Sequence, residues 1–166
     1  MKLLQQAIAI LCLFVMGIIL TAAICGAGQL SIKCANKASH LTTYTLEIEN
    51  TGDINAGVNS DLKVFVISKG LIDLLNNDEL CAVVLHENAH IALKHKIIEN
   101  TKKEYAQEYA ADLKAARDLQ SIGINGIVAC KALEKIETVI GVRGDGFSHP
   151  STANRCNHLI RNGFRR

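Results

Sequence analysis

An uncharged apolar stretch near the N-terminus limits how this chain can fold more than any other feature. No charged side chain occurs at positions 3–32, and positions 7–28 are almost wholly apolar. A helix rises about 1.5 Å per residue, so roughly 20 such residues cross the hydrocarbon core of a bilayer. A helix packed against the core of a globular domain would carry a polar face toward solvent, and this stretch has none. We therefore predict that residues 1–30 are a membrane anchor or signal peptide and that residues 31–166 form one folded domain.

The apolar stretch could be a retained membrane anchor or a cleaved signal peptide. Lys2 suits both an anchor and a cleaved signal peptide, and the small residues at 26–28 offer a cleavage site. The apolar run is longer than that of most signal peptides, which favours a retained single-pass anchor with the domain outside the cytoplasm. Cleavage would instead give a secreted or periplasmic protein. Lys33 and Lys37 balance Lys2 across the stretch, so charge leaves the orientation open.

Charge and cysteine content restrict the class of protein. The formal net charge is +2, too small to indicate a nucleic-acid partner. Aromatic residues make up 4% of the chain and tryptophan is absent, a composition that favours helices with aliphatic cores. Outside the apolar stretch there are four cysteines, an even number that is compatible with two disulfides outside the cytoplasm and equally with free thiols. They are Cys34, Cys81, Cys130 and Cys156.

The rest of the chain predicts an α+β domain, helix-dominated, with a small β-sheet. Side chains alternate at 43–49, as expected of a half-buried strand. Asn76, followed three residues later by Glu79, predicts a capping box at a helix start. The expected elements are a polar linker at 31–40, strands at 43–49 and 63–68, a short helix at 71–75, and helices at 76–98, 101–121, 127–140 and from 152 onward.

The sequence His86-Glu87-Asn88-Ala89-His90 is an H-E-x-x-H motif inside the predicted helix at 76–98. Four residues turn a helix by about 400°, so both imidazoles leave the same face and can reach one tetrahedral zinc ion. Glu87, beside the first imidazole, can direct its carboxylate at a water next to the metal and act as a general base. A chance match on a surface helix is the alternative.

A catalytic zinc site of this kind needs a third protein ligand. Glu108 lies 18 positions after His90, on the next predicted helix. Two antiparallel helices joined near residues 100–101 would bring it over the two histidines. Asp112, one turn further, could accept a hydrogen bond from a ligand imidazole and fix its tautomer. Glu104 lies on the same face and is the rival third ligand.

Several motifs in the same order resemble one enzyme family. They are G-L-I-D-L-L at 70–75 with D-E-L at 78–80, H-E-x-x-H at 86–90, E-x-x-A-D at 108–112, and His-Pro followed by Arg at 149–155, with Asn-Ala at 55–56 as a further landmark. With these motifs the chain resembles the HtpX-like zinc metallopeptidases, which are gluzincins related to the CAAX prenyl endopeptidase. The resemblance covers residues 55–160. The short interval between the second and third motifs and the single apolar segment mark a minimal version with one anchor.

The resemblance implies a zincin-like metalloprotease domain that binds one Zn²⁺ and acts on proteins or peptides, with envelope quality control as a role. The implied site consists of His86, His90 and Glu108 as ligands, Glu87 as general base, Asp112 beside a ligand imidazole, and His149 near the oxyanion of the reaction. For His149 a turn with only a packing role is the alternative. A substrate would lie extended beside the strand at 64–67, adding to the sheet edge.

Two other functions stay open. The chain could be a membrane-tethered binding or chaperone-like protein on a protease scaffold, with structural zinc. Structural zinc sites are closed by four protein ligands, and Glu87 would have no use in one. The chain could also be a latent protease whose cleft is covered by the glycine-rich loop at 141–147.

Overall fold

The computed structural model describes residues 32–96, 101–141 and 149–165. In chain order its elements are α2 (Ile32–Lys37), η1 (Ser39–Thr43), β1 (Thr45–Glu49), β2 (Ala56–Asn59), β3 (Val64–Ser68), α3 (Lys69–Leu74), α4 (Asn77–Ala92), α5 (Thr101–Ser121), α6 (Val128–Ile140) and α7 (Thr152–Arg161). The predicted helix-dominated α+β fold is confirmed. The predicted N-terminal anchor or signal peptide and nearly all of the predicted loop at 141–147 lie outside the described residues. Among the helices that are described, none combines the length and apolarity needed to cross a membrane.

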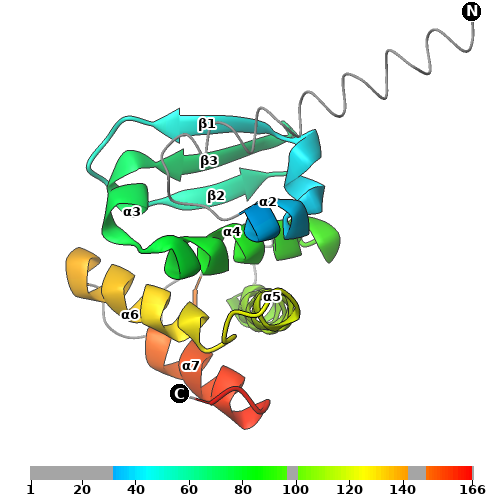
Figure 1. The fold of residues 1–166 in the computed structure, drawn as a ribbon, viewed down its shortest axis with the longest axis vertical. Coiled ribbons are helices and arrows are strands. Elements are labelled where there is room, and N and C mark those ends of the chain that lie inside the picture. Colours follow the sequence, from blue (N-terminus) through cyan, green and yellow to red (C-terminus); the bar gives the residue numbers. More distant parts are fainter. Residues whose placement is uncertain (1–31, 97–100, 142–148, 166) are drawn as a thin grey trace, which may run out of the picture.

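The sheet has three strands in the order β1-β3-β2. β3 pairs in parallel with β1 and antiparallel with β2, so both of its edges are occupied. Phe65 and Ile67 point from β3 into the core and are fully buried. The expectation that a substrate adds to the strand at 64–67 is therefore wrong. Sequence analysis missed β2, whose outer edge faces α4 rather than another strand in the described part of the chain (Figure 1).

Helix α4 forms the centre of the domain, between the sheet on one side and α5 and α6 on the other (Figure 1). It begins with the predicted capping box. The Asn76 side chain accepts hydrogen bonds from the backbone N–H groups of Asp78 and Glu79, while Glu79 Oε2 accepts one from the Asn76 N–H. Each of these bonds satisfies a backbone or side-chain group that the helix start would otherwise leave unpaired. The register of α4, and with it the direction of its histidines, is fixed from this end.

Several predicted boundaries are wrong. The strand expected from residue 43 begins at Thr45, and the short helix expected at 71–75 spans Lys69–Leu74. The expected polar linker at 31–40 contains α2 and the start of η1, and Cys34 and Ala35 of α2 are buried against the core. The helix expected to run to about residue 98 ends at Ala92, because Lys94 takes a left-handed conformation with φ 57°. The helices predicted at 101–121, 127–140 and from 152 are confirmed to within one residue at the ends that were predicted.

Two disulfides link the four cysteines of the described chain. Cys34 pairs with Cys81, which ties α2 to α4, and Cys130 pairs with Cys156, which ties α6 to α7. The choice that the sequence left open is thus decided for pairing. The second bond holds α7 close to the start of α6, and α7 carries Arg155, whose guanidinium reaches His86 of α4.

Candidate metal centre

Three side chains from two helices meet at one point. His86 and His90 project from the same face of α4, with their Nε2 atoms 2.9 Å apart. Glu108 of α5 faces them, with Oε2 3.4 Å from His86 Nε2 and Oε1 3.3 Å from His90 Nε2. One ligand atom from each residue lies within 4.8 Å of the other two. The predicted residues are therefore brought together, whereas Glu104, the rival, is not in this cluster.

The spacing of these atoms suits zinc. A tetrahedral ion with ligands at about 2.0–2.1 Å separates neighbouring ligand atoms by about 3.3 Å, close to the distances found here. The Glu108 carboxylate is buried, and the donors beside its Oε2, His86 Nε2 and Arg155 Nη1, are both 3.4 Å away. A buried carboxylate oxygen with only long contacts of this kind gains from a cation that completes its surroundings. Two imidazole nitrogens and a carboxylate thus fit a Zn²⁺ ion.

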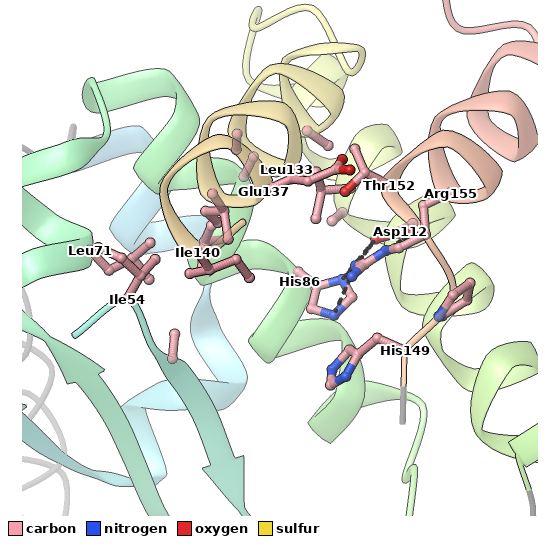
Figure 2. Close-up of a pocket in the computed structure, with 18 of the residues that line it drawn as sticks. Ile54, Leu71, His86, Asp112, Leu133, Glu137, Ile140, His149, Thr152 and Arg155 are labelled. Carbon is pink, nitrogen blue, oxygen red and sulfur yellow. Dashed lines mark hydrogen bonds and ion pairs between the residues drawn. The ribbon is translucent and has the colours of Figure 1, made fainter. Parts of the chain in front are cut away.

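Asp112 and Arg155 support His86 from behind (Figure 2). Asp112 Oδ1 lies 3.0 Å from His86 Nδ1. The Arg155 guanidinium donates two hydrogen bonds to the same carboxylate, from Nε at 2.8 Å and from Nη2 at 2.6 Å. This bidentate pair fixes the carboxylate, and the carboxylate favours the His86 tautomer protonated at Nδ1. A metal ion that binds His86 would displace the proton from Nε2, whose lone pair then points toward the cluster.

The charges of these groups shift one another's pKa values. Burial by itself would lower the pKa of His86, but hydrogen bonds to Asp112 and Glu108 outweigh it and raise the pKa to about 10. Burial would raise the pKa of Glu108, yet hydrogen bonds from His86 and His90 hold it well below its usual range. The pKa of Asp112 is also lowered against the effect of burial, by the charge and hydrogen bonds of Arg155. Both carboxylates are therefore charged at neutral pH, as ligands and supports of a cation must be.

His95 lies beside the Nδ1 atom of His90, as Asp112 lies beside the Nδ1 atom of His86. Its Nδ1 lies 3.0 Å from His90 Nδ1, and the two rings meet edge to face. Burial lowers the pKa of His95, and the charge of His90 lowers it further, so the neutral ring is favoured. A neutral His95 can accept a hydrogen bond from the Nδ1–H of His90, which directs the His90 Nε2 lone pair into the cluster.

The two residues expected to act on a substrate lie beside the cluster. Glu87 follows His86 on α4 and is buried, and its charge is among those that raise the pKa of Arg155. His149 precedes α7 with an exposed side chain, and its Nε2 is 3.7 Å from Glu108 Oε2. Figure 2 shows its ring turned toward the same space as His86. His149 thus lines the same cavity as His86, while Glu87 is placed only by its position next to His86 on α4.

Comparison with protein-family models finds a similarity over part of the chain. Residues 29–105 match the model of peptidase family M48, and this range contains both histidines of α4. Over these residues, somewhat less than half of the chain, the sequence is similar to this family. The similarity points to a metalloprotease, and the family generally uses zinc, with which the cluster of His86, His90 and Glu108 is compatible. A comparison with curated proteins finds no significant match.

The M48 match ends before several groups of the site. Glu108, Asp112 and Arg155 all follow residue 105, so their convergence on the α4 histidines is an observation of geometry that is independent of the match. In the sequence, Arg155 belongs to a motif that indicates no role for it, and His95 belongs to none of the motifs. A hydrogen-bonding arginine 43 residues after its carboxylate leaves no local pattern. A role for His95 at the site could have been suspected from the sequence, because it is a further histidine only five residues after His90.

Proposed function

We propose that this chain is a zinc-dependent endopeptidase of the HtpX-like type that hydrolyses peptide bonds of protein substrates. One observation carries the proposal: His86, His90 and Glu108 come from two helices and offer three ligand atoms within 4.8 Å of one another. With three protein ligands, a tetrahedral ion keeps one position for solvent or substrate, as catalytic zinc does. Zinc supplies Lewis acidity, which polarises a carbonyl and makes water more acidic.

The remaining residues of the site divide the work around that ion. Glu87 takes a proton from the attacking water and delivers it to the leaving amine. His149 donates a hydrogen bond to the carbonyl oxygen as negative charge develops on it. Asp112 and His95 hold the two ligand imidazoles in the tautomers that expose Nε2, and Arg155 holds Asp112. The substrate backbone lies along the outer edge of β2, between β2 and α4, in place of the strand that sequence analysis chose.

The proposed location of the protein rests on its N-terminal apolar stretch and on its cysteines. The apolar stretch at 7–28 would anchor the protein to a membrane by one span, or would be removed from a secreted or periplasmic form. Two disulfides favour a domain outside the cytoplasm, where such bonds persist. Substrates would then be proteins of the cell envelope, and quality control is the role that this setting suggests. No nucleic-acid partner is proposed.

Digestion of an unfolded protein such as casein tests the proposal. The zinc-loaded chain should cleave it, a chelator should stop cleavage, and added zinc should restore it. Glu87→Gln should retain one zinc per chain and lose cleavage by at least a hundredfold, the usual contribution of a general base or more. Zinc binding without cleavage by the unaltered chain would contradict the proposal and favour the binding or chaperone-like alternative.

The assignment of the third ligand has a matched control one helical turn away. Glu108→Gln should lower zinc affinity strongly, because a neutral amide replaces a charged ligand. Glu104→Gln, on the same helix, removes the rival carboxylate and should leave affinity unchanged. Competition with a chromogenic chelator measures both affinities. The reverse order of effects would move the third ligand to Glu104.

A further inference from the structure

A cavity of about 420 Å³ opens beside the metal centre. His86, Asp112 and Arg155 form one part of its wall, and His149 stands at the same side (Figure 2). Ile54, Leu71 and Ile140 lie opposite them in the same view. The volume falls within the range of about 300–1,000 Å³ that small-molecule sites have. The cavity is therefore continuous with the candidate site and is large enough for a bulky side chain.

The wall away from the metal centre is aliphatic. Helix α6 contributes Leu133 and Ile136, both half-buried, and α4 contributes Val83. Four alanines also line the cavity, and their small side chains leave open the space that larger residues would fill. They are Ala82, Ala115, Ala129 and Ala132. These methyl groups come from three helices, α4, α5 and α6, which meet at this part of the wall. Binding of an apolar ligand to this wall becomes more favourable in proportion to the apolar surface area that wall and ligand together remove from water.

The charged groups in the cavity wall also affect which substrate side chains can bind. Arg155 neutralises Asp112 by two hydrogen bonds, so the carboxylate in the wall that remains is that of Glu137, on α6. Figure 2 places Glu137 on the side of Leu133 and Thr152, away from His149. An acidic side chain in the cavity would be desolvated and would face this carboxylate, both of which cost free energy. The wall therefore disfavours aspartate and glutamate.

The backbone path of the proposed substrate leads to this cavity. Asn55 and Ala56, at the start of β2, line its rim. The Asn55 backbone is fixed by two hydrogen bonds to Ser68, because its N–H donates to Ser68 Oγ and its carbonyl accepts from the Ser68 N–H. A peptide paired with the outer edge of β2 projects alternate side chains to one side. One of them, next to the carbonyl at the metal centre, would face the cavity.

We propose that this cavity selects substrates with one large, neutral apolar side chain, such as leucine or phenylalanine, next to the bond that is cut. The inference rests on the proposed peptidase function and goes further by naming the substrate class. The α6 residues Leu133 and Ile136 determine how large that side chain can be, and Glu137 excludes acidic ones.

Mass-spectrometric identification of the cleavage sites in a digested peptide mixture tests the inference. Large apolar residues should be enriched at one position flanking the cut, with kcat/KM for leucine about tenfold to a hundredfold above that for alanine in peptides that differ only there. Peptides with aspartate or lysine at this position should be cleaved less well than the alanine peptide.

Variants of α6 separate the cavity from general effects. Ile136→Phe fills the cavity and should move the preference toward alanine and valine, whereas Ile136→Ala enlarges it and should favour phenylalanine over leucine. Val139→Phe adds the same ring three residues later at a position that is 55% exposed and does not line the cavity. This control should keep the preference of the unaltered chain.

Each outcome has one meaning. If the zinc-loaded chain cleaves no peptide, the proposed function fails and the inference fails with it. If the chain cleaves peptides with no preference at either flanking position, or prefers a basic residue there, only the inference is overturned. The same holds if the preference is unchanged in both Ile136 variants. Since one variant removes atoms and the other adds them, a folding failure of either leaves the other as a test.

Discussion

Removal of the Arg155 charge should destabilise the domain far more than removal of an exposed lysine. Arg155 is 7% exposed and Asp112 is 2% exposed, and two hydrogen bonds join them. Loss of one member of a buried ion pair costs about 3–5 kcal/mol, because the other charge stays buried without its partner. His86 lies 3.0 Å from Asp112 and keeps one partner for it. We therefore expect Arg155→Met to cost about 3 kcal/mol, the lower end of that range.

Urea denaturation of the chelator-treated protein measures this cost. With a slope of about 2 kcal/mol per molar urea, 3 kcal/mol moves the midpoint by about 1.5 M. Lys69→Met is the matched control, because Lys69 and Asp73 form an ion pair with side chains that are 53% and 56% exposed. Such pairs contribute about 0–1 kcal/mol. The double variant Asp112→Leu with Arg155→Met should be more stable than Arg155→Met alone. Equal small losses for Arg155→Met and Lys69→Met would refute the reasoning.

Three further predictions concern the supports of the metal centre. His95→Ala should weaken zinc binding about 10–100-fold, and His95→Asn, which can still accept a hydrogen bond from His90, should recover part of it; equal affinity in all three chains would remove His95 from the site. Replacement of Cys130 and Cys156 by serine opens a loop with a sequence separation of 26 and should cost about 3 kcal/mol in urea denaturation. Because the pKa of Asp112 is lowered in the fold, its contribution to stability is present above about pH 4 and should be lost as the pH falls below that value; a pH series of denaturation midpoints, flattened in Asp112→Asn, checks the sign.

The sequence predicts the parts of the fold that local chemistry decides. The start of α4 follows from Asn76 and Glu79, which pair within four residues. The end of α4 was not predictable, because the residues from Leu93 to Lys96 include good helix formers and no glycine or proline. There the contact of His95 with His90 accompanies the end of the helix. That contact depends on the packed domain.

β2 and α2 escaped prediction for a similar reason. The four residues of β2, A-G-V-N, have low strand propensity, and their pairing with β3 supplies what the local sequence lacks. Helix α2 is short and has no acidic residue in its first turn, yet a disulfide from Cys34 and the burial of Ala35 hold it against the core. In both segments tertiary contacts decide the structure.

For the site, motif spacing predicted which residues converge and placed Asp112 beside a ligand imidazole, but it did not predict how Asp112 and His90 are themselves held. The helical repeat places His86 and His90 on one face, and helix order brings Glu108 to them. The pairing of Arg155 with Asp112 joins residues on different helices, and the cavity beside α6 arises from the approach of three helices. These features depend on packing distances that no local pattern encodes.

The central claim is that one zinc ion is held by three side chains and keeps an open position. Crystals of the zinc-loaded protein, with diffraction recorded on both sides of the zinc absorption edge, test it most directly. The account predicts one anomalous peak per chain, within about 2.0–2.2 Å of Nε2 of His86, Nε2 of His90 and a carboxylate oxygen of Glu108, with no fourth protein ligand. A peak elsewhere, a peak closed by four protein ligands, or a peak without Glu108 would contradict it.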